Sequence, residues 1–245
     1  MRNLHIGYMY MLAAFRKIIS QLAVGLRAEV CENIGMCFSA TASFASGTAL
    51  SAAGVSTLAK TETREDIPIA AIPLLFGAQQ ILEGVVWLSL SRVDQTCTKI
   101  PAYGFLFFAF ILWPVFIPFV AARGEQDAFR KRLFVPFKLG GIAVALYYLY
   151  FMFYSPLITR VAGHSIVYYI ASPQNYAVAG IYVLITCGSL LLSSRNILKL
   201  FGILTSVAFV ATYYFYHVTL TSVWCFFAAI LSAVIYWYFW SKRKK

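Results

Sequence analysis

At residues 67–90 the chain reads IPIAAIPLLFGAQQILEGVVWLSL, and this stretch decides the fold. It is long and apolar enough to cross a membrane as a helix, which takes about 20 such residues. Glu83 lies inside it, the one acidic residue in the middle of a long apolar run. Because a carboxyl group at membrane depth costs about 2.5–3.5 kcal/mol, we expect it to face a protein interior and to mark a functional site.

The whole chain has the composition of an integral membrane protein. Hydrophobic residues make up 61% of its 245 residues and charged residues 12%, and the mean hydropathy is +0.75. Seven segments are suited to span a membrane: 38–58, 67–90, 101–121, 134–154, 176–192, 197–216 and 220–240. Backbone groups in lipid must pair within the protein, and no alternating barrel pattern is visible. The sequence therefore predicts an all-α, seven-transmembrane helix bundle.

The net charge of +11 suggests nucleic-acid binding only until the positions of the charges are considered. If the loop after the first span is cytoplasmic, that side holds most of the basic residues around the spans, namely Lys60, Arg64, Arg123, Arg130, Lys131, Arg132, Lys138, Arg195, Lys199 and the tail Lys242, Arg243, Lys244 and Lys245. The other side holds Arg92, Lys99 and Arg160. This bias predicts that the N-terminal end of the first span is outside and the C-terminus cytoplasmic, in a bacterial inner membrane or its equivalent. The basic tail can also contact anionic lipids.

Residues 1–35 form an N-terminal extension to the membrane domain at 36–245. They resemble a signal peptide only loosely, since Arg16 and Lys17 interrupt the apolar run. Two other interpretations stay open. Residues 7–28 can form an interfacial amphipathic helix. Alternatively, translation starts at Met36 and the first 35 residues are not part of the protein, which we favour slightly.

From Met36 onward the chain carries three motifs that occur together in a known family. Residues 36–44 read MCFSATASF, residues 73–87 read PLLFGAQQILEGVVW, and residues 222–229 read SVWCFFAA. The combination resembles an uncharacterised family of bacterial-type multi-pass membrane proteins, a domain of unknown function. Its specific motifs lie in the first, second and seventh spans. The resemblance implies the architecture and the motif positions, and it implies no activity.

Polar residues from four predicted spans fall in the same leaflet. Gln79, Gln80 and Glu83 are three or four residues apart and so share one helix face, in the outer half of their span. The sequence therefore predicts an outer-leaflet polar pocket centred on Glu83. Its candidate ligand-binding or proton-carrying residues are Glu83, Gln79, Gln80, His217, Ser39, Ser222, Trp87 and Trp224. A purely structural polar cluster that joins the helices is an equally weighted alternative.

The surroundings of this pocket have simpler interpretations. In the first span Ser39, Ser43, Gly47 and Ser51 recur every four residues, a pattern that lets a neighbouring helix approach closely. Aromatic runs at 147–151 and 213–216 can line an apolar cavity, although lipid-facing packing is the simpler expectation. The loop at 155–175, which contains His164, is long enough to cover the pocket, but we expect a plain connector.

A metal site is a further hypothesis. Glu83, His217 and Cys225 supply oxygen, nitrogen and sulfur ligands suited to zinc or another transition metal, with Cys37 as a fourth candidate. A site of three histidines within the spans is excluded, because the chain has 3 histidines and His5 lies in the extension. Cys225 and Cys187 in apolar runs are more often small buried hydrophobes. Cys37 can instead form a disulfide with Cys97, with Cys31 as a competitor.

Three functions fit these residues. The favoured one is binding of a small molecule or ion, either as a receptor-like sensor or as a transporter in which Glu83 loads and releases a proton. The second is a metal-dependent membrane hydrolase that uses Glu83, His217 and Cys225. The third is a structural role for the polar cluster. Retinal is excluded as a cofactor, because the last three spans hold no lysine at mid-membrane. Nucleotide-binding and common hydrolase motifs are absent.

Overall fold

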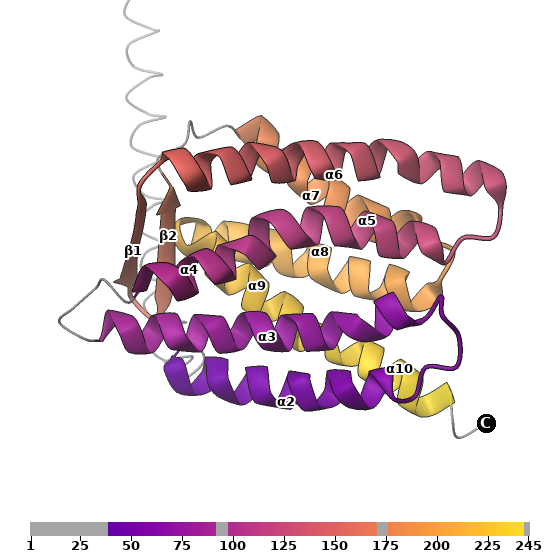
Figure 1. Cartoon of the computed structure of the whole chain (residues 1–245), viewed down its shortest axis with the longest axis horizontal. Coiled ribbons are helices and arrows are strands. Elements are labelled where there is room, and N and C mark those ends of the chain that lie inside the picture. Colours follow the sequence, from indigo (N-terminus) through magenta and orange to yellow (C-terminus); the bar gives the residue numbers. More distant parts are fainter. Residues whose placement is uncertain (1–38, 92–97, 171–175, 243–245) are drawn as a thin grey trace, which may run out of the picture. The chain divides into compact units, whose positions relative to one another are not determined.

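The computed structural model describes residues 39–91, 98–170 and 176–242, which form helices and one two-stranded sheet (Figure 1). The helices are α2 (Ala40–Leu58), α3 (Ile67–Leu90), α4 (Lys99–Leu106), the π-helix η2 (Phe107–Leu112), α5 (Trp113–Arg123), α6 (Ala128–Tyr154), α7 (Tyr176–Leu192), α8 (Asn196–Tyr216), the 3-10 helix η3 (His217–Thr219), α9 (Leu220–Leu231) and α10 (Ala233–Lys242). The strands are β1 (Leu157–Ala162) and β2 (Ser165–Ile170). The N-terminal extension, Cys37, Cys97 and the last three residues lie outside the described residues, as do the predictions made for them.

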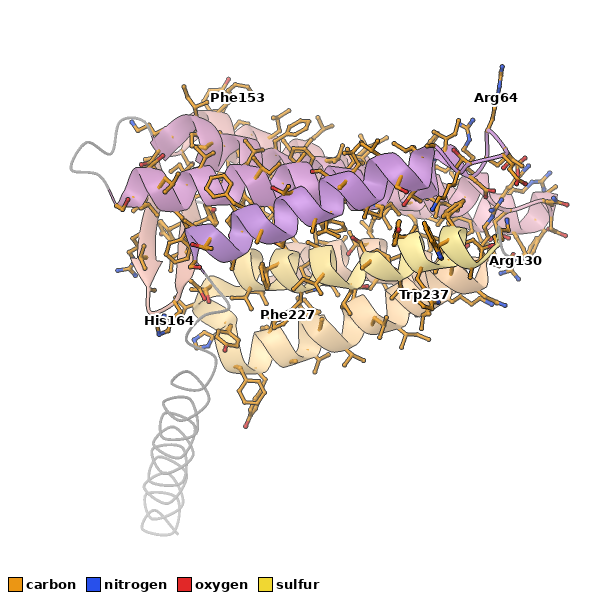
Figure 2. All side chains as sticks on the ribbon, turned by 90° about the horizontal axis from the view of Figure 1, so that it is seen from below. Arg64, Arg130, Phe153, His164, Phe227 and Trp237 are labelled. Atoms are coloured by element: carbon orange, nitrogen blue, oxygen red, sulfur yellow. The ribbon has the colours of Figure 1, made fainter. Side chains whose placement is uncertain are left out.

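The helical fold class is confirmed. The third predicted segment is made of α4, η2 and α5, and the seventh of α9 and α10. Among the described residues, four helical stretches are long and apolar enough to cross a membrane: Ile67–Leu90, Lys99–Arg123 (α4 to α5), Ala128–Tyr154 and Asn196–Lys242 (α8 to α10). Ala177–Leu192 is a shorter apolar helix. Large apolar side chains cover the outside of these helices. Phe153 is 77% exposed and Trp237 71%, and Figure 2 shows both side chains on the outside of the ribbon. Such a surface fits a lipid bilayer, and the chain is an integral membrane protein by this criterion.

Small residues hold α2 and α3 together, as the stripe in the sequence predicts. A Cβ added at Gly77 of α3 would lie 2.5 Å from the Ser51 hydroxyl and 2.9 Å from the Gly47 carbonyl oxygen of α2. One added at Gly54 would lie 2.4 Å from the Leu74 backbone nitrogen. The two backbones are therefore close enough that only glycine fits at the contact points. This packing is typical of helices in membranes, where close approach replaces the hydrophobic effect as the source of association.

The π-helix η2 lies between α4 and α5 and interrupts the regular helix there. Within η2 the Trp113 N–H donates to the Phe108 carbonyl, one residue further back than in an α-helix. The next residue, Pro114, has no N–H, so the Ala109 carbonyl is left without its partner along the helix. The Tyr182 hydroxyl of α7 donates to that carbonyl at 2.5 Å. The distortion thus fixes α7 against η2.

The loop at 155–175, predicted as a plain connector, contains a β-hairpin. The strands pair antiparallel from Leu157↔Ile170 to Ala162↔Ser165, leaving Gly163 and His164 as the turn. Gly163 has φ +61, the left-handed conformation that a two-residue hairpin turn requires at this position. The inner strand is covered: Ile166 is fully buried and packs with Val86 of α3 and Ala102 of α4. The hairpin is therefore part of the folded structure.

Charged loops meet at the opposite end of the helices. Arg195, before α8, pairs with Asp66 at the start of α3 and lies 3.5 Å from Glu65. Lys242 at the end of α10 lies 3.8 Å from the same Asp66. In Figure 2 Arg64 and Arg130 lie at this end and His164 at the other. The α2–α3 and α7–α8 connections and the end of α10 thus share one end of the bundle, as alternating helices require.

Candidate functional site

Glu83 lies in the interior of the helices. It is only 1% exposed, and it occupies the face of α3 that also carries Gln79 and Gln80, both fully buried. The Ser222 hydroxyl of α9 donates to its Oε1 at 2.5 Å, and Gln80 Nε2 donates to its Oε2 at 3.2 Å. The sequence interval between Glu83 and Ser222 is 139 residues, so the fold alone brings them together. Three of the residues singled out from the sequence, Glu83, Gln80 and Ser222, are thus hydrogen-bonded to one another.

Gln79 connects this cluster to α5 and α9. Its Oε1 accepts a hydrogen bond from the Trp113 indole N–H at 2.8 Å, and both side chains are buried. The same amide lies beside the Cys225 thiol, which is also within electrostatic reach of Glu83. Trp113 was not among the residues singled out from the sequence. The signal that could have found it is chemical, because a buried indole N–H almost always has an acceptor.

Three buried polar atoms of this region have no hydrogen-bond partner among the described residues: Gln79 Nε2, Gln80 Oε1 and Tyr168 Oη. Tyr168 comes from β2, and its ring stacks on Phe105 with centroids 4.7 Å apart. Burial, and after it the neighbouring carboxyl group of Glu83, raises the pKa of Tyr168 well above its ordinary value. The hairpin thus places a phenol next to the carboxyl group. Buried polar groups are normally paired, so these three atoms are exceptions to the usual pairing.

An apolar cavity of about 40 Å³ adjoins the cluster. Phe76, three residues before Gln79 on α3, lines it together with Trp113 and Cys225. The remaining lining residues are Ile117, Tyr182, Thr186, Cys187, Leu190, Phe201, Thr205, Trp224 and Ala228. It therefore lies between α3, α5, α7, α8 and α9. Since one water molecule needs about 10–15 Å³, the cavity has space for more than one molecule of that size. The runs at 147–151 and 213–216 do not appear in its lining, and Tyr150, Tyr213 and Tyr214 are exposed, as the simpler interpretation expects.

The other predicted residues make contacts with different parts of the protein. The Ser39 hydroxyl caps α2, accepting from the Ala42 N–H at 3.2 Å. Trp87 packs with Val223 and Phe226. The Trp224 indole donates to the Thr205 carbonyl at 3.1 Å, and both residues line the cavity. His217 is exposed in η3, whereas Glu83 is buried.

The metal hypothesis gains no support from the described residues. Among residues 39–91, 98–170 and 176–242, no three His, Cys, Asp or Glu side chains are grouped so as to hold a metal ion. Cys187 and Cys225 are buried free thiols, as expected of cysteines in apolar runs. Cys37 lies outside the described residues. The metal site therefore stays a prediction from the sequence.

A second polar cluster, which was not predicted from the sequence, lies at the charged end. Glu125, only 2% exposed, accepts the Ser194 N–H at 2.5 Å and the Ser193 hydroxyl at 3.3 Å, and it also pairs with Arg130 at 3.1 Å. Arg130 in turn donates to the Leu192 carbonyl at 2.8 Å. Burial alone raises the pKa of Glu125, but the hydrogen bonds from Ser194 and the charge of Arg130 outweigh it and hold the pKa below its usual range. This cluster ties the α5–α6 loop to the α7–α8 loop.

Comparison with known proteins gives a family and no activity. Residues 36–245 match a family described only as a family of unknown function (DUF6629). The match starts at the residue where the resemblance in the sequence begins. No curated protein and no solved structure matches the chain.

Proposed function

Since the chain belongs to this family of unknown function, DUF6629, we propose from the site itself that it is a membrane protein whose Glu83 site binds a small molecule or ion. One observation carries the proposal. A buried carboxyl group receives hydrogen bonds from Ser222 and Gln80 while three neighbouring polar atoms have no partner among the described residues. A cluster that served only to join helices is expected to satisfy its own polar groups, because an unpaired buried group costs about 1–3 kcal/mol.

The unpaired atoms offer both kinds of hydrogen-bonding group. Gln79 Nε2 is a donor, Gln80 Oε1 is an acceptor, and the Tyr168 hydroxyl can act as either. Together with the carboxylate they suit a cation, a proton carried with water, or a small polar solute. They come from α3 and from the hairpin, so an occupant would join a membrane helix to the structure that covers it. This arrangement supports a sensor and a transporter alike.

Seven spans with the charged end in the cytoplasm are part of the proposal. Supporting it, α2, α7 and the combined α9–α10 are apolar helices beside the long ones, and three connections join at the charged end. That end carries Lys60, Arg64, Arg123 and Lys131, which favours the cytoplasm. The basic tail that follows Lys242 would then meet the anionic lipids of the inner leaflet.

Ligand-dependent stability tests the proposal. Protein in lipid nanodiscs is unfolded thermally in sodium, potassium, acidic and tetramethylammonium buffers, as wild type and as Glu83→Gln. A ligand at about 100 times its Kd stabilises the folded state by about 2.7 kcal/mol, so a saturable rise in Tm is expected in wild type and not in Glu83→Gln. The matched control is Glu62→Gln, an exposed carboxyl in the α2–α3 loop, which should behave as wild type.

The opposite result is equally clear. If every probe shifts wild type and Glu83→Gln by the same amount, the cluster is structural and the binding proposal fails. If one probe raises the Tm of wild type and not of Glu83→Gln, flux of that probe into liposomes distinguishes a transporter from a sensor. Flux that is lost in Glu83→Gln supports transport, and saturable binding without flux supports a sensor.

A further inference from the structure

We infer that the β-hairpin is the lid of the Glu83 site and that Tyr168 of β2 closes it, an inference that rests on the proposed binding function of Glu83. The first reason is the position of Glu83 along α3. Leu90, at the hairpin end of α3, is about 10 Å from it along the helix, whereas Ile67, at the charged end, is about 24 Å away. The shorter way from Glu83 to water therefore leads through the hairpin end.

Toward the charged end, apolar packing closes the interior. Phe76, Ile72 and Ile69 precede Gln79 at intervals of three or four residues, so they continue its side of α3. Each is at most 4% exposed, and all three belong to one cluster of buried apolar side chains. An ion or a polar solute would lose its water shell over several helical turns on this path. This side of Glu83 therefore disfavours the entry of a polar ligand.

At the hairpin end, the cover over the site is the hairpin itself. Ile166 and Tyr168 alternate along β2 and so share one face. Ile166 packs with Val86, which stands one turn after Glu83 on α3. Tyr168 packs against that cluster and against a second one, which contains Cys225 of α9. β1 contacts α3 and β2 contacts α9. The hairpin thus bridges the two helices that supply the carboxyl group and its hydroxyl donor.

The hairpin has the properties of an element that opens by itself. It has two strands, and a two-stranded hairpin alone is marginally stable in water. Several of its side chains are exposed, with Ile158 at 52%, Val161 at 46% and Tyr169 at 45%. The Tyr168 hydroxyl is buried and has no hydrogen-bond partner among the described residues, so packing alone holds this side chain in place. An element with few buried contacts opens at a lower cost than the whole fold.

The reaction rate of a thiol at the site measures access to it. In a background without the 5 native cysteines, Ser222→Cys places a thiol beside Glu83. The full chain in nanodiscs reacts with methanethiosulfonate ethyltrimethylammonium, a permanently charged reagent that enters from water, and the labelled fraction is measured by mass. We expect this thiol to react at least about a hundredfold more slowly than the thiol of His164→Cys at the hairpin turn.

Two variants loosen the lid in different ways. Tyr168→Ala removes the ring that closes it. Gly163→Val strains the turn, because Gly163 has φ +61 and no atom among the described residues lies within 4 Å of a Cβ there. Each should speed the labelling of Ser222→Cys about tenfold. The matched controls are Tyr169→Ala, the same change at the next, exposed side chain, and Tyr168→Phe, which keeps the ring. Both should be labelled at the unchanged rate.

The outcomes separate the lid from the proposed function. Faster labelling in Tyr168→Ala and Gly163→Val, with both controls unchanged, supports the lid. Equal rates in all variants overturn it, since the reagent would then avoid the hairpin. Faster labelling in Tyr168→Ala alone also overturns it, because a fixed wall would behave in this way.

The nanodisc stability measurements with Glu83→Gln complete the separation. If the lid variants respond but no probe raises the Tm of wild type more than that of Glu83→Gln, the lid is supported and the proposed function fails. If a probe does so and labelling ignores the hairpin, the proposed function stands and the lid is overturned.

Discussion

At the scale of single residues, the site depends on which atoms of Gln79, Gln80 and Glu83 have partners. The three side chains are buried on one face of α3, and each is held by a contact to another group. Gln79 and Gln80 each have one of their two amide atoms paired among the described residues, and Gln79 loses its hydrogen bond when Trp113 is replaced. Substitutions at these positions therefore report on pairing more than on packing.

Trp113→Phe should destabilise the protein by about 1–3 kcal/mol, because it leaves the Gln79 carbonyl oxygen buried without a donor. The measurement is the midpoint of unfolding in SDS or on heating. Trp237→Phe is the control, as the same change at a side chain that is 71% exposed. Equal effects at the two positions would contradict the importance of the Trp113–Gln79 hydrogen bond.

At the scale of helices and loops, neighbouring helices pack closely where a glycine lets their backbones approach. The clearest case joins α5 and α6, where a Cβ added at Gly141 would lie 2.0 Å from the Pro114 carbonyl oxygen. That atom belongs to the backbone and cannot rotate away. The helices must then separate if the glycine gains a side chain.

Gly141→Ala should therefore lower stability by about 1–3 kcal/mol through overpacking. Gly180→Ala in α7 is the matched control, since among the described residues no atom lies within 4 Å of a Cβ at that position. There the change should be neutral or stabilise by up to about 1 kcal/mol, because alanine is the better helix former. Thermal unfolding of both variants checks the pair. A stable Gly141→Ala protein would show that α5 and α6 are not packed this closely.

The loop cluster around Glu125 should make stability depend on pH. Its folded-state pKa lies below the ordinary value of 4.5, so its contribution is fully present above that value and is lost as pH falls through the folded pKa. Glu125→Gln should lower stability at neutral pH and flatten the acidic part of the profile. Hydrogen exchange of residues 193–196 is the local readout, with Glu62→Gln as the control. An unchanged acidic profile in Glu125→Gln would contradict this role.

At the scale of the whole molecule, the charged end and the hairpin end are chemically different. The first gathers Arg and Lys side chains with the buried Asp66 and Glu125, and the second carries the hairpin beside the Glu83 site. If the charged end is cytoplasmic, the hairpin and the site face the outside. Orientation can thus be measured at two exposed residues, Arg64 and His164.

In a background without the 5 native cysteines, His164→Cys should react with a membrane-impermeant maleimide on intact cells. Arg64→Cys should react only after the membrane is permeabilised. Labelling is measured by the mass shift of the purified protein, and both variants are compared with the cysteine-free protein. The reverse pattern would place the Glu83 site toward the cytoplasm.

By itself the sequence determined the class of this protein, the positions of its helices and the residue at its polar centre. Apolar runs of membrane length and one mid-run carboxyl group are local features, so Glu83, Gln79 and Gln80 could be placed on one helix face by spacing alone. Gly163 was also a local signal for the hairpin turn, but the apolar composition around it concealed this signal. Only the tertiary structure decided which partners those residues meet. Packing of distant segments brings Ser222, Trp113 and Tyr168 to the Glu83 region. Aromatic residues that face lipid and those that line the cavity look alike in the sequence, and only packing distinguishes them.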